Sequence, residues 1–591
     1  MAYYSPYPTN PETRTYFWTP LISKEGINGK EDLMKNCAAL FSFVCLATMA
    51  LVSCGGGIPM ADKILIKGKI WTVNPRQPWA EAVAVRDHKI IAVGSTKDIQ
   101  KMAGGKTEVI DVKGAFVLPG FIDSHVHFTN GGYSLMNIQL REARSKEEFI
   151  RRIAEKAKSL PKGEWILNGD WDQTQFEPVE LPNKEWIDAV TPETPVCVNR
   201  LDGHMILANS LALKLGGVTK NTPVPPGGEI VKDPATGEPT GILKDAAMDL
   251  VYSRIPEPTA AQNLRAAEAA MKYAAEKGVT SVHDVSGEAG FDVYQDLLKN
   301  HKLITRILFY IPITSADLVL RMKFKTPFGN EFLEFGGLKG FADGSLGSAT
   351  AYFFEPYADD PKISGLLHAE MFPGGIMEKR VLAADKAGLQ TAIHAIGDRA
   401  NSIILDIYEK AVAQNEARDR RFRIEHAQHL KPADIARFGR LNVIASVQPY
   451  HAIDDGRWAE KKIGPDRAKT TYPFKSFLDH GVTLACGSDW PVAPMDPILG
   501  IYAAVTRRTL DGKNPDGWIP EQKISLEEAI RGFTINGAYA GFAEKIKGSI
   551  EAGKLADLVV LDKNFFEIKP DEIQNAKVIM TVMNGEIVFR R

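Results

Sequence analysis

Short runs that alternate apolar and polar residues open the globular part of the chain. Residues 62–112 contain KILIKGKIWTV, AEAVAVRDHKIIAVG and TEVIDVKG, separated by Gly or Asp-His turns. This two-residue period predicts a small antiparallel sheet. The pattern returns near the other end in GKLADLVVLD and in KVIMTVMNGEIVF, which has an Asn584-Gly585 hairpin turn. We therefore predict one discontinuous β-sandwich domain, formed by residues 60–117 and 545–591.

The middle of the chain alternates short apolar runs with helical patterns. The first strand candidate is 117–128, and the others are 279–284, 306–313, 337–343, 389–396, 422–428, 443–449 and 483–489. The helical patterns include 259–278, with Thr259 as N-cap and Gly278 as stop, and 398–415. Eight strand-then-helix units predict an α/β fold, a closed parallel TIM (β/α)8 barrel at 118–544. Functional residues of such barrels lie at the carboxyl ends of the strands.

An insertion follows the first barrel strand. About 130 residues separate this strand from the helix at 259, far more than a βα loop needs. They contain a helical pattern at 146–159, then GEWILNGDWDQTQF and VCVNRLDGHMILANSLAL. We predict an inserted cap at about 130–258 that covers the barrel mouth and encloses a mostly apolar pocket.

The first 59 residues are predicted to lie outside the fold. Residues 34–54 read MKNCAALFSFVCLATMALVSC, an uncharged run after a lysine that is short for a membrane span and typical of a signal peptide. The run ends in a cysteine followed by three glycines, which resembles a bacterial lipoprotein cleavage site. This interpretation makes Met34 the start, lipidates Cys54, and places the protein in the cell envelope or periplasm. The alternatives are an uncleaved signal anchor, a disordered leader or a cytoplasmic protein.

Composition narrows the classes of partner. The formal net charge of −2 argues against nucleic acid or a polybasic membrane surface, which leaves a small molecule as the expected partner. Cys197 and Cys486 are expected to be separate buried thiols rather than a disulfide. The oligomeric state stays open, with a homodimer as the default.

Residue types that bind metals gather at the predicted strand ends. His125 and His127 occupy alternate positions of the first strand, so both side chains can reach one point. The later strand ends add His283, Asp284, Lys339, Asp343, His394, His426 and Asp489. A single strand-end histidine is more often a hydrogen-bonded core residue. A whole set at one barrel mouth, however, supplies nitrogen and oxygen ligands suited to zinc, with iron or manganese as alternatives.

Several of these stretches resemble the amidohydrolase superfamily, in particular its amidohydrolase-3 branch, which includes N-substituted formamide deformylases. They are VLPGFIDSHVHF, LKGFADGSLGSATA, TAIHAIGDRA, RIEHAQ, GSDWPV and GSIEAGKLADLVVLD, spread over residues 62–590. The resemblance implies a metal-dependent hydrolase barrel. The residues that it implies as ligands of one or two metals are His125, His127, His394, His426 and Asp489.

Lys339 is implied by the resemblance as a carboxylated lysine that bridges two metals. A neutral lysine amine takes up CO2 to give an anionic carbamate, which is an oxygen ligand. The alternative is an ordinary lysine paired with Asp343 or Glu425.

The implied reaction is hydrolysis of a C–N bond in an amide, a cyclic amide or a carbamate by metal-activated hydroxide. Asp489 would accept the proton as general base and return it to the departing nitrogen as general acid. His283, or His204 from the cap, would polarise the carbonyl oxygen.

Residues with supporting roles are less specific. Asp398 is expected to orient His394 or Arg399, and Asp343 to act near Lys339. Trp490 is a candidate for substrate contact or packing. His429 competes with His426 as a ligand, although RIEHAQ favours His426.

Other functions remain open. One is deamination of a heterocycle, which uses the same chemistry with one metal and without a lysine bridge. Another is a non-catalytic binding lipoprotein, which predicts broken ligand positions, and none is broken here. The sequence does not name the substrate.

Overall fold

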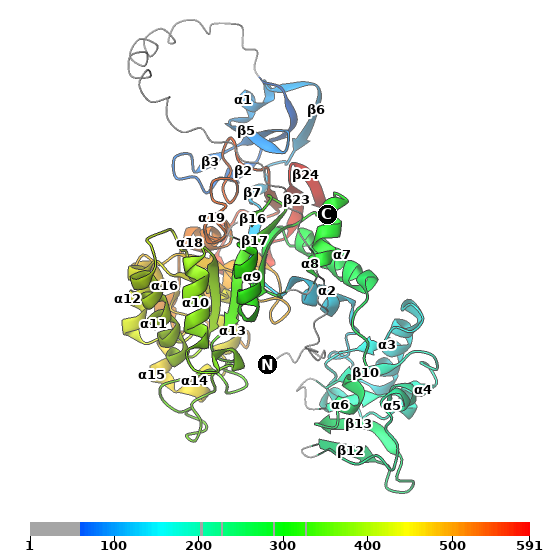
Figure 1. The fold of residues 1–591 in the computed structure, drawn as a ribbon. Helices are drawn as coiled ribbons and strands as arrows, with labels where there is room; N and C mark the ends of the chain where they lie inside the picture. Colours follow the sequence, from blue (N-terminus) through cyan, green and yellow to red (C-terminus); the bar gives the residue numbers. More distant parts are fainter. Residues whose placement is uncertain (1–58, 201–204, 226–227, 288–289, 325–327) are drawn as a thin grey trace, which may run out of the picture.

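The structure is a computed structural model that describes residues 59–200, 205–225, 228–287, 290–324 and 328–591 (Figure 1). Met34 and Cys54 lie outside the described residues, so the lipoprotein interpretation stays a prediction. Within the described ranges, no helix combines the length and the apolar character needed to cross a membrane.

A first β-sheet comes from the start of the described chain. Its strands, in spatial order, are β5 (Lys89–Gly94), β4 (Ala82–Arg86), β1 (Ala61–Ile66) and β6 (Ala103–Asp111). The prediction of an antiparallel sheet is wrong for one pair, because β1 and β6 are parallel. The short helix α1 (Thr96–Gln100) stands between β5 and β6 and lets the chain cross over to the far side of β1.

A second sheet joins the two ends of the chain. Its order is β24 (Glu586–Arg590), β23 (Val578–Met583), β22 (Leu558–Leu561), β7 (Phe116–Pro119), β2 (Lys69–Trp71) and β3 (Trp79–Ala80). Val83 of the first sheet and Val117 and Val560 of the second belong to one buried apolar cluster. Both chain ends are needed to bury these faces, which confirms the predicted discontinuous β-sandwich.

The centre of the molecule is a parallel barrel. Its strands are β8 (Phe121–Val126), β14 (Val279–Asp284), β15 (Arg306–Pro312), β17 (Leu333–Phe341), β18 (Gln390–Ala395), β19 (Arg423–His426), β20 (Ile444–Val447) and β21 (Leu484–Cys486). Neighbours pair in this order, and the two ends meet where Asp489 N donates to His125 O at 2.7 Å and His127 N to Trp490 O at 2.8 Å. The predicted (β/α)8 barrel is confirmed.

The predicted first strand, 117–128, is in fact two strands in two sheets. β7 belongs to the β-sandwich and β8 to the barrel, with Gly120 between them. A Cβ on Gly120 would lie 2.3 Å from Thr280 Oγ1, so only glycine lets the chain pass this close to β14. One apolar run therefore serves two cores.

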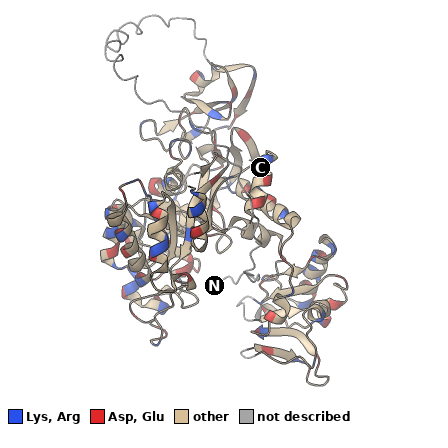
Figure 2. Cartoon of the chain, viewed as in Figure 1, with Lys and Arg blue, Asp and Glu red and all other residues tan. Residues whose placement is uncertain are grey.

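Helices surround the barrel. The predicted helix at 259–278 is α7 (Ala260–Glu276), with a capping box between Thr259 and Gln262. The others that pack around the strands are α8 (Phe291–Lys299), α9 (Ala316–Met322), α10 (Ile376–Lys386), α11 (Asp398–Gln414), α12 (Pro432–Leu441), α16 (Phe474–Asp479), α17 (Pro497–Thr506) and α18 (Leu526–Gly532). Acidic and basic residues are intermixed along these helices (Figure 2).

Short helices mark the two ends of the barrel. At the amino end, α19 (Ile535–Ala540) is held by Asn536 Nδ2 to Leu484 O at 3.0 Å and by Gln390 Nε2 to Ala540 O at 3.0 Å. At the carboxyl end, the chain after β20 forms α13 (Pro449–Asp455), α14 (Ala459–Ile463) and α15 (Pro465–Ala468). The ligand-type residues also lie at this carboxyl end.

The insertion folds around a sheet of its own. After α2 (Phe128–Met136), it contains a sheet of order β12 (Gly228–Lys232), β13 (Pro239–Asp245), β11 (Met205–Ala208), β10 (Val196–Asn199) and β9 (Ile166–Leu167). The helices α3 (Lys146–Ser159), α4 (Glu185–Asp188), α5 (Ser210–Leu215) and α6 (Asp249–Tyr252) pack on it. Figure 1 shows this cap as a lobe beside the barrel. An ion pair of 2.5 Å joins Glu164 of the cap to Arg265 of α7. The predicted enclosed pocket stays a prediction.

Candidate metal and catalytic site

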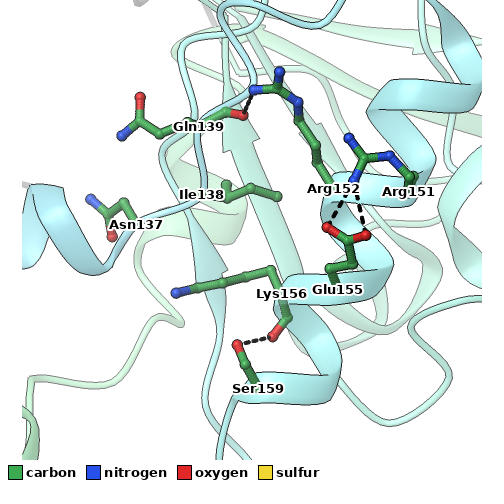
Figure 3. A pocket seen from close by; sticks show the side chains of 8 residues that line it. All are labelled: Asn137, Ile138, Gln139, Arg151, Arg152, Glu155, Lys156 and Ser159. Atoms are coloured by element: carbon green, nitrogen blue, oxygen red, sulfur yellow. Dashed lines mark hydrogen bonds and ion pairs between the residues drawn. The ribbon is translucent and has the colours of Figure 1, made fainter.

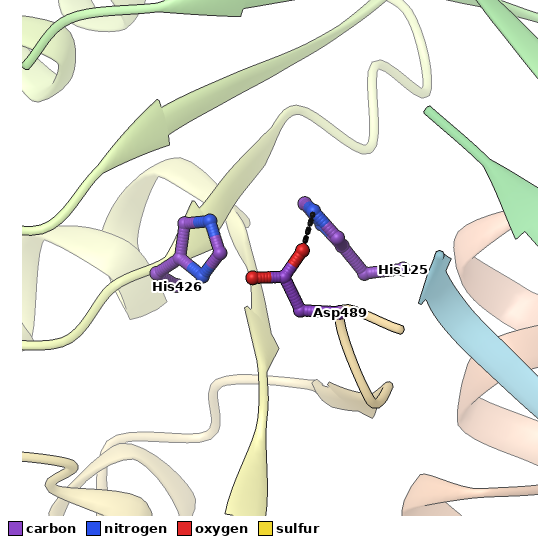
Figure 4. Close-up of side chains that lie close together, drawn as sticks. All are labelled: His125, His426 and Asp489. Carbon is purple, nitrogen blue, oxygen red and sulfur yellow. Dashed lines mark ion pairs between the residues drawn. The ribbon is translucent and has the colours of Figure 1, made fainter. Parts of the chain in front are cut away.

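Three predicted ligands meet at the carboxyl end of the barrel. His125 of β8, His426 of β19 and Asp489, which follows β21, place one ligand atom each within 4.8 Å of one another (Figure 4). His125 Nε2 lies 3.4 Å from Asp489 Oδ1, and the rings of His125 and His426 are 4.9 Å apart. All three side chains are buried. The barrel thus brings together residues that are far apart in the sequence.

The backbone turns at two of these positions. His426 has φ of 73° and Asp489 has φ of 61°, which non-glycine residues rarely adopt. In a regular strand Glu425 and His426 would point to opposite faces. The left-handed turn instead lets both side chains lie inside the barrel. Such strain is typical of functional sites.

His127 reaches the same carboxylate from the mouth side. Its Nε2 lies 3.4 Å from Asp489 Oδ1, the same separation as for His125. Its side chain is 25% exposed, whereas that of His125 is fully buried. His125 and His127 thus share Asp489 as a partner, with His125 in the barrel interior and His127 nearer the solvent.

Hydrogen bonds determine which ring nitrogen of each histidine is available. His125 Nδ1 is 2.5 Å from Glu425 Oε2, and His426 Nδ1 is 2.7 Å from Gln448 Oε1. A carboxylate oxygen and an amide oxygen accept, so each Nδ1 donates and each Nε2 is left for a ligand. The buried His125 Nε2 has no hydrogen-bond partner.

The charges favour a cation between these groups. Burial lowers the pKa of His125, but the carboxylates of Glu425 and Asp489 raise it above its ordinary value. Burial also works against the ionised form of Asp489, yet the contacts with His125 and His127 hold its pKa well below the usual range. Burial keeps the pKa of His426 well below the usual range as well. A metal ion would supply the positive charge that a proton supplies here.

Lys339 stands on β17 beside the cluster. Its side chain is buried, its Nζ has no hydrogen-bond partner, and Nζ lies 3.8 Å from the centroid of the Phe341 ring. Burial lowers its pKa to about 8, against the opposing effect of Glu425 and Asp489. The structure therefore holds Lys339 as a buried amine without a hydrogen-bond acceptor.

His394 lies next to the cluster but points elsewhere. Its ring centroid is 4.5 Å from that of His426, while its Nε2 is 3.1 Å from Gly344 O and 3.4 Å from Asp343 Oδ1. The structure thus does not include His394 in the group of three ligand atoms. Asp343 in turn accepts hydrogen bonds from the backbone amides of Ile396, Gly397 and Tyr352, which ties the loops after β17 and β18 together.

The remaining candidates lie around these residues. Asp398 accepts from Phe354 N at 2.9 Å at the start of α11. Trp490 is buried and stacks on Tyr273 with ring centroids 5.4 Å apart.

His429 bonds to Thr471 Oγ1 at 2.8 Å and is not in the group of three. His204 lies outside the described residues.

His283 is turned away from the strand ends. Its Nδ1 accepts from Arg423 Nη1 at 2.9 Å, and a Cβ on Gly541 would lie 3.2 Å from its Nε2. Gly541 follows α19, at the amino end of the barrel. The structure therefore does not bring His283 to the ligand cluster, because Arg423 holds its ring beneath the site.

The sequence predicted neither Gln448 nor Arg423 as a site residue, and it offered Glu425 only as a possible partner of Lys339. An Arg and a Glu at alternate positions of a buried strand, as in RIEHAQ, signal an internal ion pair. Cys197 and Cys486 are free and buried, which confirms that they form no disulfide with each other.

A separate hollow of about 470 Å³ lies in the cap (Figure 3). It is lined by Asn137, Ile138, Gln139, Arg151, Arg152, Glu155, Lys156 and Ser159. The charged groups there already have partners, since Arg151 pairs with Glu155 at 2.8 Å and Arg152 donates to Gln139 O at 2.7 Å. It shares no residue with the ligand cluster.

Comparison with known proteins places the chain among hydrolases. A sequence profile of the Amidohydrolase family matches residues 108–589. The chain is 41% identical to Protein LONG AFTER FAR-RED 3 of Arabidopsis thaliana over 90% of this chain and 92% of that protein. It is 28% identical to the N-substituted formamide deformylase of Arthrobacter pascens over 90% and 99%. A solved metal-dependent hydrolase of Pyrococcus horikoshii matches with 30% identity and a TM-score of 0.72, over 86% and 99%.

Proposed function

Because this chain belongs to the amidohydrolase family, we propose that it hydrolyses a C–N bond of a small amide-type molecule at a divalent metal site. The observation that carries the proposal is the meeting of His125, His426 and Asp489 at the barrel mouth. The similarity to a protein named N-substituted formamide deformylase supports the choice of a C–N bond.

The residues fit a divalent cation such as zinc, with iron or manganese as alternatives. Two imidazole nitrogens and a carboxylate oxygen within 4.8 Å form a common zinc donor set, and His127 is the nearest additional donor. The buried Nε2 of His125 has no hydrogen-bond partner and lies 3.4 Å from Asp489 Oδ1, so a cation bound by both atoms would stabilise the pair. When bound, such a metal lowers the pKa of a water molecule and polarises a carbonyl oxygen.

Asp489 is the proposed proton carrier. Its low pKa keeps it ionised at neutral pH, so it can accept a proton from the attacking water. The same carboxyl group then donates the proton to the departing nitrogen. Because His125 and His127 both contact Oδ1 of Asp489, the second oxygen is the one better placed for transfer.

The metal site makes a first prediction about bound metal. The double replacement of His125 and His127 by alanine should lower the metal content of the purified protein several-fold, because both nitrogens facing Asp489 are removed. Elemental mass spectrometry after mild purification measures this. The exposed His480, on α16's end, provides the control His480→Ala, which should keep the wild-type content. An unchanged metal content in the double variant would contradict the site.

Carboxylation of Lys339 is proposed as the source of a second metal site. A buried amine with a pKa near 8 has an appreciable neutral fraction, and the neutral amine adds CO2 to give a carbamate and a proton. The carbamate oxygens would place an anionic metal ligand beside the cluster, at a position where the unmodified Nζ has no hydrogen-bond partner.

A second prediction follows for Lys339→Met. The variant should lose one of two bound metals and should no longer respond to bicarbonate during metal loading. Lys547 is a matched control, because it is also buried with a pKa of about 8, yet its Nζ donates to Ser281 Oγ at 2.6 Å. Lys547→Met should keep the wild-type stoichiometry. Two metals in Lys339→Met would rule out the bridge, and one metal in the wild type would favour a deaminase.

A further inference from the structure

A buried ion pair lies directly beneath the ligand cluster. The fully buried guanidinium of Arg423 donates to Glu425 Oε1 at 2.8 Å and to Glu425 Oε2 at 3.1 Å. Its other bonds go to Ser124 O at 2.6 Å, His283 Nδ1 at 2.9 Å, Tyr310 OH at 2.9 Å and Ser446 Oγ at 3.0 Å. Arg423 thus links β8, β14, β15, β19 and β20, which places Glu425 rigidly within the barrel.

The anchored carboxylate of Glu425 holds the ring of His125 by a hydrogen bond. Its Oε2 accepts from His125 Nδ1 at 2.5 Å, a contact between residues 300 positions apart. Both side chains are completely buried, so water does not compete for the bond. The ring of His125 is therefore held on one side by Glu425 and faces Asp489 on the other.

We propose that Glu425 is a positioning residue of the metal site, which fixes the orientation and tautomer of His125 and is itself anchored by Arg423. The proposal rests on the proposed metal site. A carboxylate only accepts hydrogen bonds, so its partner Nδ1 carries the hydrogen and Nε2 keeps the lone pair that a metal needs. Glu425 is fully buried and bonds to His125 Nδ1, so its proposed effect on the orientation of the metal ligands runs through His125.

The other buried histidine shows why the carboxylate matters. His426 Nδ1 faces an amide, Gln448, whose orientation is set by a bond from its Nε2 to Ser446 O at 3.4 Å. At position 425 an amide has a different effect. A glutamine there can turn its NH2 group toward His125 Nδ1, which puts the hydrogen on Nε2 and blocks ligation.

The competing explanation is that the Arg423–Glu425 pair only stabilises the fold. The chain contains a second Arg–Glu pair for comparison. Arg421 and Glu544 form a second Arg–Glu pair, with Nη1 to Oε2 and Nη2 to Oε1 both at 2.9 Å. Neither residue contacts a ligand of the cluster. Glu544→Gln therefore removes a negative charge from a less buried Arg–Glu pair, in which Glu544 is 25% exposed, without touching His125.

The test is metal affinity of the full chain, measured by competition with a chromogenic chelator for zinc. Glu425→Gln should weaken zinc binding by about 10- to 100-fold, the usual effect of removing a group that orients a ligand. Glu544→Gln should bind zinc like the wild type. The cobalt-substituted protein gives a second readout, since its visible spectrum should change in Glu425→Gln and not in Glu544→Gln.

A double-mutant cycle separates positioning from general destabilisation. In a His125→Ala background, Glu425→Gln should weaken zinc binding much less than in the wild type, because the hydrogen bond that orients His125 is gone. An equal weakening in both backgrounds, or wild-type affinity in Glu425→Gln, overturns the proposal while the metal site stands. Absence of zinc binding in the wild type would overturn both.

A conservative variant covers the case in which Glu425→Gln does not fold. Glu425→Asp keeps an acceptor-only group and the charge opposite Arg423, but it shortens the reach to His125 Nδ1. We expect an affinity between those of the wild type and His125→Ala, with the wild-type melting profile. A folded Glu425→Asp with affinity equal to the wild type, together with an unchanged cobalt spectrum, would overturn the proposal.

Discussion

Replacing Asp489 with asparagine is expected to lower turnover by roughly 10³-fold while most of the bound metal remains. The amide oxygen of asparagine can still ligate a metal, but the group cannot accept and return a proton at neutral pH. General acid–base catalysis contributes about 10²–10⁴-fold in typical enzymes, so kcat should fall by roughly 10³-fold. The site is sensitive to this change because the low pKa of Asp489 makes the wild-type group fully ionised.

The measurement pairs kcat on a panel of N-formyl and N-acyl amines with metal content from the same preparation. Asp434→Asn is a suitable control, because Asp434 is a buried carboxylate whose partner is Arg437 on α12 at 3.0 Å, outside the site. It should retain wild-type kcat. A near-normal rate in metal-loaded Asp489→Asn would show that another group carries the proton.

Replacing Asp557 with alanine is expected to be strongly destabilising, although the residue lies outside the site. Asp557 Oδ2 accepts from Arg306 Nε at 2.7 Å and Asp557 Oδ1 from Arg306 Nη2 at 2.9 Å. Both side chains are almost fully buried, and Gly120 N donates to the backbone oxygen of Asp557 at 2.8 Å. This pair therefore lies where the β-sandwich joins the barrel.

Removing one partner of a buried pair leaves an uncompensated charge, which costs about 3–5 kcal/mol. For a protein of this size, in which about 1 kcal/mol lowers the melting temperature by about 1 °C, the apparent melting temperature should fall by roughly 3–5 °C. Differential scanning calorimetry of Asp557→Ala measures the change. Asp111→Ala removes an exposed carboxylate that pairs with Lys67 at 2.7 Å, and it should leave the melting temperature unchanged. Equal melting of Asp557→Ala and the wild type would contradict a structural role for the pair.

The barrel was predictable because its strands and helices carry local signals. The strand predicted at 279–284 matches β14, since an internal parallel strand is a short apolar run bounded by turn residues. The helix predicted at 259–278 matches α7, whose capping box is visible in the sequence as Thr259 and Gln262. Both signals depend only on neighbours along the chain.

Other features depended on contacts that no local pattern contains. The run at 117–128 shows one apolar pattern, but the passage at Gly120 divides it between two sheets. The parallel pairing of β1 with β6 needed a crossover through α1. In each case the same sequence pattern is compatible with either arrangement, and packing against a distant segment selects one.

The sequence by itself determined which residue types stand at the strand ends, and the resemblance made candidate metal ligands of six of them, namely His125, His127, Lys339, His394, His426 and Asp489. Only the tertiary structure decided how each side chain is used. His283 is the next-to-last residue of β14 and His426 the last of β19, yet Arg423 holds the ring of His283 beneath the site, whereas a left-handed backbone turn brings His426 into it. The physical reason is that a side chain's direction follows from its hydrogen-bond partners, and the partners here, such as Glu425 for His125, come from strands 300 residues away.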